Sequence, residues 1–164
     1  MGNIWEFAKN IEQEGQAYYT TLARETPVSE LKGVFNQMAA EEKKHYDLFE
    51  ALSQKKSAGR EAGKDILGTA KQAFSSIAEG FTKSPVINDS ESAYRKALDL
   101  EKKSVEYYQD ALGKVESPDA KDTLGFIIGE EKKHVKIVEQ IVEMVRNPKQ
   151  WVEDAEFSHI DETF

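Results

Sequence analysis

Four glutamates, two histidines and two tyrosines of the sequence form pairs separated by one fixed interval. The pairs, each 89 positions apart, are Glu12 and Glu101, Tyr19 and Tyr108, Glu42 and Glu131, and His45 and His134. The pentapeptide Glu-Glu-Lys-Lys-His also occurs twice, at 41–45 and 130–134, in the same register. Repetition at one offset indicates two similar structural units related by an approximate two-fold axis.

The residue types in these pairs are those that bind two metal ions a short distance apart. Carboxylate oxygens can bridge two ions, and imidazole nitrogens complete each coordination sphere while leaving positions open for a substrate. A Glu and a His three positions apart lie on one face of a helix, so one helix can offer both to one site. We expect two iron ions, although manganese and zinc accept the same ligands. The predicted ligands are Glu12, Glu42, His45, Glu101, Glu131 and His134.

These ligands interrupt apolar stripes that follow the spacing of core-facing helices. Seven residues bring a helix to within about 20° of two full turns, so Glu12 faces the same way as Trp5 and Tyr19. Buried charges are costly unless they are paired or bound to metal, which argues against a metal-free structural bundle. We therefore predict a metal site in the core, with the acids on neighbouring faces flanking the site or lying at the surface. The residues expected to lie outside the ligand set are Glu14, Glu41, Glu106, Glu130 and, in the tail, His159.

The tyrosine pair has two interpretations. Each phenol lies two turns after a predicted ligand, Glu12 or Glu101, and could simply be a core aromatic residue. It could also donate a hydrogen bond to a ligand carboxylate across the bundle and fix its orientation. In that second interpretation Tyr19 and Tyr108 support the catalytic site.

The pattern predicts an all-α protein of one domain, 1–164, with long helices near 3–25, 29–55, 89–115 and 118–146. Short links make 3–55 and 89–146 antiparallel hairpins. The long segment 56–88 is predicted to cross over between them. Seven apolar residues mark a short amphipathic helix there: Ile66, Leu67, Ala70, Phe74, Ile77, Ala78 and Phe81. The tail 147–164 is expected to pack on the bundle or on a second subunit through Trp151, Phe157 and Phe164.

Composition excludes several other classes of protein. The chain has no cysteine, which excludes disulfides, thiolate metal sites and a catalytic thiol. A net charge of −8 argues against a nucleic-acid surface. The sequence shows neither a secretory signal nor an apolar run that could cross a membrane. We therefore expect a cytoplasmic protein that binds neither nucleic acid nor membrane.

The motifs resemble the di-iron domain of the rubrerythrin group, within the ferritin-like superfamily, over roughly residues 3–146. That group carries Glu-x6-Tyr on the first and third helices and Glu-x-x-His on the second and fourth. The resemblance implies a ferritin-like four-helix bundle of two hairpins with one long crossover. It also implies that Glu42 and Glu131 bridge the irons, and that the terminal ligands are Glu12, His45, Glu101 and His134.

By the same resemblance, the activity would be reduction of hydrogen peroxide or dioxygen, in defence against oxidative stress. Typical members receive electrons through an attached rubredoxin domain, which needs four cysteines. This chain has none, so the donor would be a separate, rubredoxin-like protein. Typical members also carry a further Glu three residues after the third-helix ligand. Ser104 occupies that position here and Gly15 its counterpart, which gives a symmetric six-ligand site also similar to bacterioferritin.

Two other functions remain open at this point. Iron binding, oxidation and storage would need a shell of many subunits, whereas an oxidoreductase would be a homodimer or larger homo-oligomer. A hydroxylase similar to the membrane-associated quinone hydroxylases would use the crossover helix as an interfacial anchor. The lysines near that helix do not make it strongly basic, so this function is disfavoured.

Overall fold

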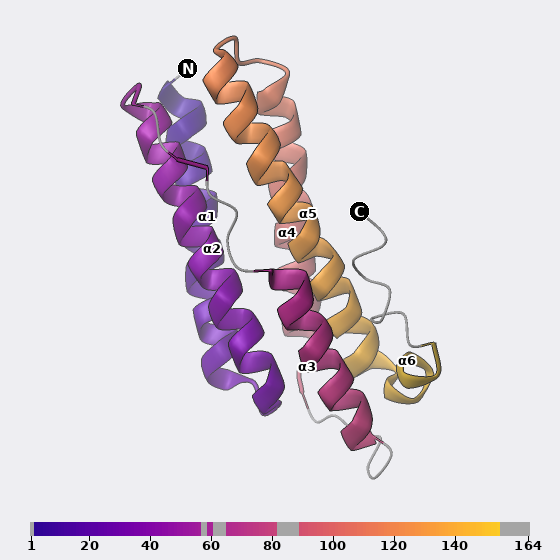
Figure 1. Cartoon of the computed structure of the whole chain (residues 1–164). Helices are drawn as coiled ribbons and strands as arrows, with labels where there is room; N and C mark the ends of the chain where they lie inside the picture. The colour runs from indigo at the N-terminus through magenta and orange to yellow at the C-terminus, as the bar shows by residue number, and fades with distance from the viewer. Residues whose placement is uncertain (1, 57–58, 61–64, 82–88, 155–164) are drawn as a thin grey trace.

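The computed structural model describes residues 2–56, 59–60, 65–81 and 89–154, and these residues form six helices and no strand. The four long helices are α1 (Gly2–Glu25), α2 (Ser29–Ser53), α4 (Glu91–Leu112) and α5 (Pro118–Arg146). They run side by side as two antiparallel hairpins, α1 with α2 and α4 with α5 (Figure 1). The predicted all-α, ferritin-like class of fold is confirmed.

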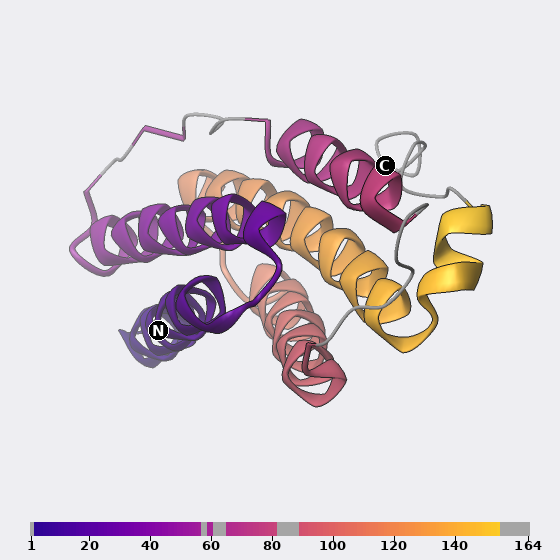
Figure 2. The same cartoon turned by 90° about the horizontal axis from the view of Figure 1, so that it is seen from below.

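The hairpins face each other across the bundle, with α1 beside α4 and α2 beside α5 (Figure 2). Packing within each hairpin is much more extensive than packing between hairpins. The two halves of the repeat therefore meet along a seam through the middle of the molecule. Residues on that seam are the ones that the two-fold relation brings together.

The helix ends follow from local chemistry and differ by a few residues from the predicted ends. Ser90 caps α4 by accepting a hydrogen bond from the Ala93 amide, and Ser117 caps α5 in the same way, with proline at the next position. The α2 helix ends two residues before the predicted position 55. Lys55 has φ = 57°, a left-handed conformation in which a helix cannot continue.

Two shorter helices cover one side of the bundle. The α3 helix (Ile66–Phe81) coincides with the predicted amphipathic segment and packs against α2 and α5. The α6 helix (Pro148–Asp154) lies in the tail, where no helix was predicted. Trp151 of α6 is buried, with its ring 5.8 Å from the ring centroids of both Phe74 and Phe81. Phe157, His159 and Phe164 lie outside the described residues.

The apolar core is divided into two clusters, one toward each end of the bundle. One contains Leu31, Phe35 and the apolar face of α3, and the other contains Trp5, Phe49 and Leu124. The layer between the two clusters is filled by charged and polar side chains. Within the described ranges, none of the helices combines the length and apolar character needed to cross a membrane.

Candidate metal centre

The polar layer contains all six predicted ligands, two from α2, two from α5 and one each from α1 and α4. Each is buried, with at most 4% of its surface exposed. They form two overlapping groups, and within each group one potential ligand atom per residue lies within 4.8 Å of all the others. Both groups contain Glu42 and Glu131. The remaining members are Glu12 and His45 in the first group, and Glu101 and His134 in the second.

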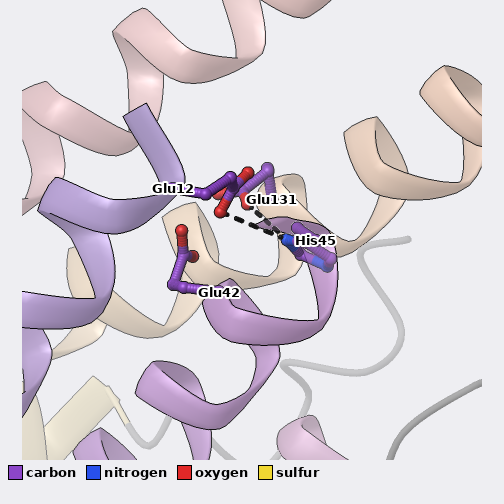
Figure 3. Close-up of side chains that lie close together, drawn as sticks. All are labelled: Glu12, Glu42, His45 and Glu131. Atoms are coloured by element: carbon purple, nitrogen blue, oxygen red, sulfur yellow. Dashed lines mark hydrogen bonds and ion pairs between the residues drawn. The ribbon is translucent and has the colours of Figure 1, made fainter. Parts of the chain in front are cut away.

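The Nδ1 atom of each histidine faces one carboxylate of the other half and one of its own half. His45 Nδ1 lies 2.9 Å from Glu131 Oε1 and 3.5 Å from Glu12 Oε2. His134 Nδ1 lies 3.0 Å from Glu42 Oε1 and 3.5 Å from Glu101 Oε1. Figure 3 shows the first group, with Glu12, Glu131 and His45 drawn together and the Glu42 carboxylate beside them. The two imidazole centroids are 6.4 Å apart, so the centre is a single site with two similar ends.

Each tyrosine of the repeat donates a hydrogen bond across the seam to a carboxylate of the other half. The Tyr19 hydroxyl donates to Glu101 Oε1 at 2.7 Å, and the Tyr108 hydroxyl donates to Glu12 Oε1 at 2.8 Å. Both phenols are buried, and burial raises the pKa of each well above its usual value. They therefore remain donors at any physiological pH. Of the two interpretations of this pair, the geometry favours the one in which the phenols orient ligands.

The first glutamate of each Glu-Glu-Lys-Lys-His repeat lies beside the ligands, so of the two expectations for Glu41 and Glu130 the geometry favours flanking acids over surface acids. Glu41 is buried and accepts a hydrogen bond from His134 Nε2 at 2.9 Å, while Glu130, with 14% of its side chain exposed, accepts one from His45 Nε2 at 2.6 Å. The sequence left both expectations open because a side chain about 100° away from the seam can face solvent or a neighbouring helix. A helix in a four-helix bundle also contacts a neighbour on that face. The signal that could have identified them is the repetition of both acids.

The carboxylates of Glu41 and Glu130, here called the outer glutamates, fix the orientation of the two histidine rings. A histidine that donates its Nε2 hydrogen to a carboxylate keeps the lone pair of Nδ1 directed at the other acids. In both halves that direction is the centre of the cluster. The arrangement is the one that metal-binding histidines typically adopt.

The acids of the cluster repel one another in a medium that stabilises ions poorly. Burial, with help from the charge of Glu131, raises the pKa of Glu12 to about 6. Burial and then the neighbouring carboxylates raise the pKa of Glu42 and of Glu131 well above the usual value. Burial opposes ionisation of Glu101 as well, but a hydrogen bond with Glu131 and the charge of His134 lower its pKa to about 2. A cation at the centre would relieve this repulsion.

The residues present fit a metal pair on a further, independent observation. Four buried carboxylate oxygens in the described part of the chain accept no hydrogen bond, namely the Oε2 atoms of Glu12, Glu41, Glu101 and Glu131. Unsatisfied buried oxygens are rare in folded proteins because each loses its hydration without replacement. Three of the four belong to predicted ligands, and carboxylate and imidazole groups are suitable ligands for iron, manganese or zinc.

A cavity of about 340 Å³ adjoins the centre between α1 and α4. Glu42 and Glu101 form part of its wall, so a molecule in the cavity would meet the second ligand group. Gly15, which also lines the cavity, lies against the Glu42 side chain. A Cβ atom there would be 2.7 Å from Glu42 Oε2, so glycine is needed for Glu42 to hold its position.

The helical bundle and its central layer of glutamates and histidines define a ferritin-like carboxylate metalloprotein. The family model described as Rubrerythrin matches residues 3–142. The chain therefore belongs to the rubrerythrin family, whose members are di-iron carboxylate proteins. The predicted resemblance is thus confirmed. No curated protein and no solved structure matched the chain.

Proposed function

We propose that the protein is a di-iron oxidoreductase that reduces hydrogen peroxide or dioxygen with electrons from a separate donor in the cytoplasm. The observation that supports this proposal best is the overlap of the two buried ligand groups beside a cavity. Two metal ions with shared carboxylates can supply two electrons to one substrate, which is the number that cleavage of a peroxide bond requires. Family membership supports the oxidoreductase class in general.

The grouping of the ligands indicates which would bridge the two ions and which would bind only one. Glu42 and Glu131 belong to both groups, so they would bridge the two ions. The remaining carboxylate and imidazole of each group would bind one ion each. Because each ion then has few protein ligands, coordination positions stay open for a substrate that enters from the cavity.

The residues around the ligands exclude water and handle protons. Tyr19 and Tyr108 hold one oxygen of Glu101 and Glu12, respectively, and so limit how those carboxylates rotate. The protons for the reduced oxygen would come from a glutamate of the centre or from a bound water. The two apolar clusters on either side keep the layer dry, which strengthens every electrostatic interaction in it.

The direct test is stopped-flow mixing of the anaerobic diferrous protein with hydrogen peroxide, followed at the near-ultraviolet bands of oxo-bridged ferric pairs. We expect oxidation faster than that of free ferrous ion at the same concentration. A variant that lacks both shared ligands, Glu42→Gln with Glu131→Gln, should show no such acceleration. The variant Glu106→Gln, at an exposed position of α4, is the matched control and should behave as the parent protein. A parent protein no faster than free ferrous ion would refute the proposal.

A further inference from the structure

The cavity between α1 and α4 is built by equivalent residues of the two halves. Its wall contains three pairs at the offset of 89: Ile11 and Leu100, Gly15 and Ser104, and Tyr18 and Tyr107. The two halves of the repeat thus enclose the cavity as well as the metal layer. It is a regular feature of the seam and reaches the centre at Glu42 and Glu101.

Small residues keep the cavity open at its inner end. Gly15 has no side chain, and the Ser104 hydroxyl turns back along its own helix to donate to the Leu100 carbonyl at 2.9 Å. Larger side chains at these two positions would fill the space between the helices. The walls further out are mainly apolar or aromatic, with the exposed Glu14 and Lys103 as the charged members of the lining. The exposed Phe7 ring lies 4.6 Å from the ring of Tyr107.

The size and lining of the cavity do not match hydrogen peroxide alone. Each water molecule occupies roughly 30 Å³ in the liquid, and hydrogen peroxide is only a little larger. A cavity of about 340 Å³ is within the range that binds small organic molecules. Burying an apolar group against its apolar walls contributes roughly 25 cal/mol per Å² to the free energy of binding. A fully polar molecule would not benefit from this contribution. The polar groups available at the inner end are the carboxylates of the centre.

We propose that this cavity binds the organic group of an organic hydroperoxide, with the peroxide oxygens directed at the metal centre. The proposal rests on the proposed function and specifies its class of substrate. Glu42 and Glu101 receive the polar end, and Ile11, Leu100, Tyr18 and Tyr107 surround the apolar group. The cavity meets the second ligand group, so substrate approaches the centre from the side of Glu101.

The reaction is a two-electron reduction of the peroxide bond. The O–O bond of ROOH breaks and takes up two electrons, which two ferrous ions held by the six ligands would supply, one electron each. The two oxygen atoms take up two protons in total, and the products are the alcohol ROH and water. The alcohol leaves through the cavity by which the hydroperoxide entered.

Binding can be tested without turnover. Cumene hydroperoxide would yield 2-phenylpropan-2-ol, which cannot oxidise the centre, so this alcohol is titrated into the purified protein by calorimetry. We expect saturable binding at one site per chain. Ser104→Leu, which fills the inner end, should raise the dissociation constant by about tenfold or more, equivalent to roughly 1.4 kcal/mol. Ile11→Phe, on the opposite wall, should also weaken binding, which covers the case that Ser104→Leu does not fold.

The control variant is Gln109→Leu, an equal apolar substitution at an exposed position of α4 that does not line the cavity. It should bind the alcohol as the parent does. No saturable binding by the parent protein would overturn the proposal. Equal binding by the parent and both cavity variants would overturn it as well.

Stopped-flow oxidation separates this proposal from the proposed function. We expect the rate with cumene hydroperoxide relative to the rate with hydrogen peroxide to fall by about tenfold or more in Ser104→Leu and to stay constant in Gln109→Leu. Oxidation by hydrogen peroxide without any effect of the cavity variants on that ratio would refute the cavity proposal alone. Acceleration by neither oxidant, together with saturable alcohol binding, would refute the proposed function and leave the cavity as a binding site.

Discussion

The two halves of the molecule agree in the residues that face the centre and differ in those around it. All six predicted ligands, both tyrosines and both outer glutamates recur at the offset of 89. At the same offset, Glu14 corresponds to Lys103 and Gly15 to Ser104. Glu41 is buried, whereas its counterpart Glu130 is partly exposed. A pair of metal ions would require the same geometry from both halves wherever side chains bind or orient a ligand.

The largest expected effect tests the equivalence of the two halves at the shared ligands. Glu42→Gln and Glu131→Gln each remove an anionic oxygen from both groups at nearly constant volume. We expect each to lower metal affinity by more than the roughly 10–100-fold that loss of an outer partner causes. Metal content by mass spectrometry should fall from two ions per chain to one or fewer, to the same extent in both variants.

In the metal-free protein, the same two substitutions should increase thermal stability. Without metal, each amide replaces a carboxylate that is repelled by its neighbours, so the metal-free variants should unfold at a higher temperature than the metal-free parent. A variant that keeps two ions per chain, or a large difference between the two, would contradict the symmetric centre.

The sequence was sufficient to predict the elements that the repeat and the helical period control. Apolar periodicity placed the four long helices and α3, and the offset of 89 placed Glu12, Glu42, His45 and their counterparts in one layer. The hydrogen bonds from Tyr19 and Tyr108 to carboxylates of the other half were only one of two interpretations of this pair. The choice between them depends on how far the two side chains reach across the seam.

Other features could not be predicted because they depend on tertiary packing. The burial of Glu41 requires the position of α5, and the short α6 helix is held by the contact of Trp151 with α3. The cavity requires the separation of α1 and α4, which no single helix encodes. Helical periodicity describes one helix at a time, so it does not show which residues a second helix buries.

The outer glutamates allow a test of the difference between the halves. Glu41→Ala leaves the Nε2 hydrogen of His134 without a partner in a buried position, at a cost of about 1–3 kcal/mol. Glu130→Ala also removes a hydrogen-bond acceptor, here of His45 Nε2, but at a partly exposed position where water can replace the lost oxygen. We expect metal affinity, measured by competition with a chelator, to fall by roughly 10–100-fold for Glu41→Ala and by less for Glu130→Ala. Equal losses would show that the exposure of Glu130 has no consequence.

The smallest expected effect separates folding from ligand placement at Gly15 and Ser104. Gly15→Ala should gain helix stability of up to about 1 kcal/mol. Its Cβ would lie 2.7 Å from Glu42 Oε2, the free end of a flexible side chain, so Glu42 should move rather than the helix. We therefore expect a metal-free protein at least as stable as the parent, but weaker metal binding and shifted absorption bands.

Ser104→Ala is the matched substitution in the other half. It removes only the hydrogen bond from Ser104 to the Leu100 carbonyl, so stability should change by no more than about 1 kcal/mol. Metal affinity and the absorption bands should stay as in the parent, because no ligand has to move. Thermal unfolding of the metal-free proteins and spectra of the iron-loaded proteins give both quantities. If Gly15→Ala left the spectrum unchanged while Ser104→Ala altered it, Glu42 would not depend on the glycine, and the asymmetry between the halves would lie on α4.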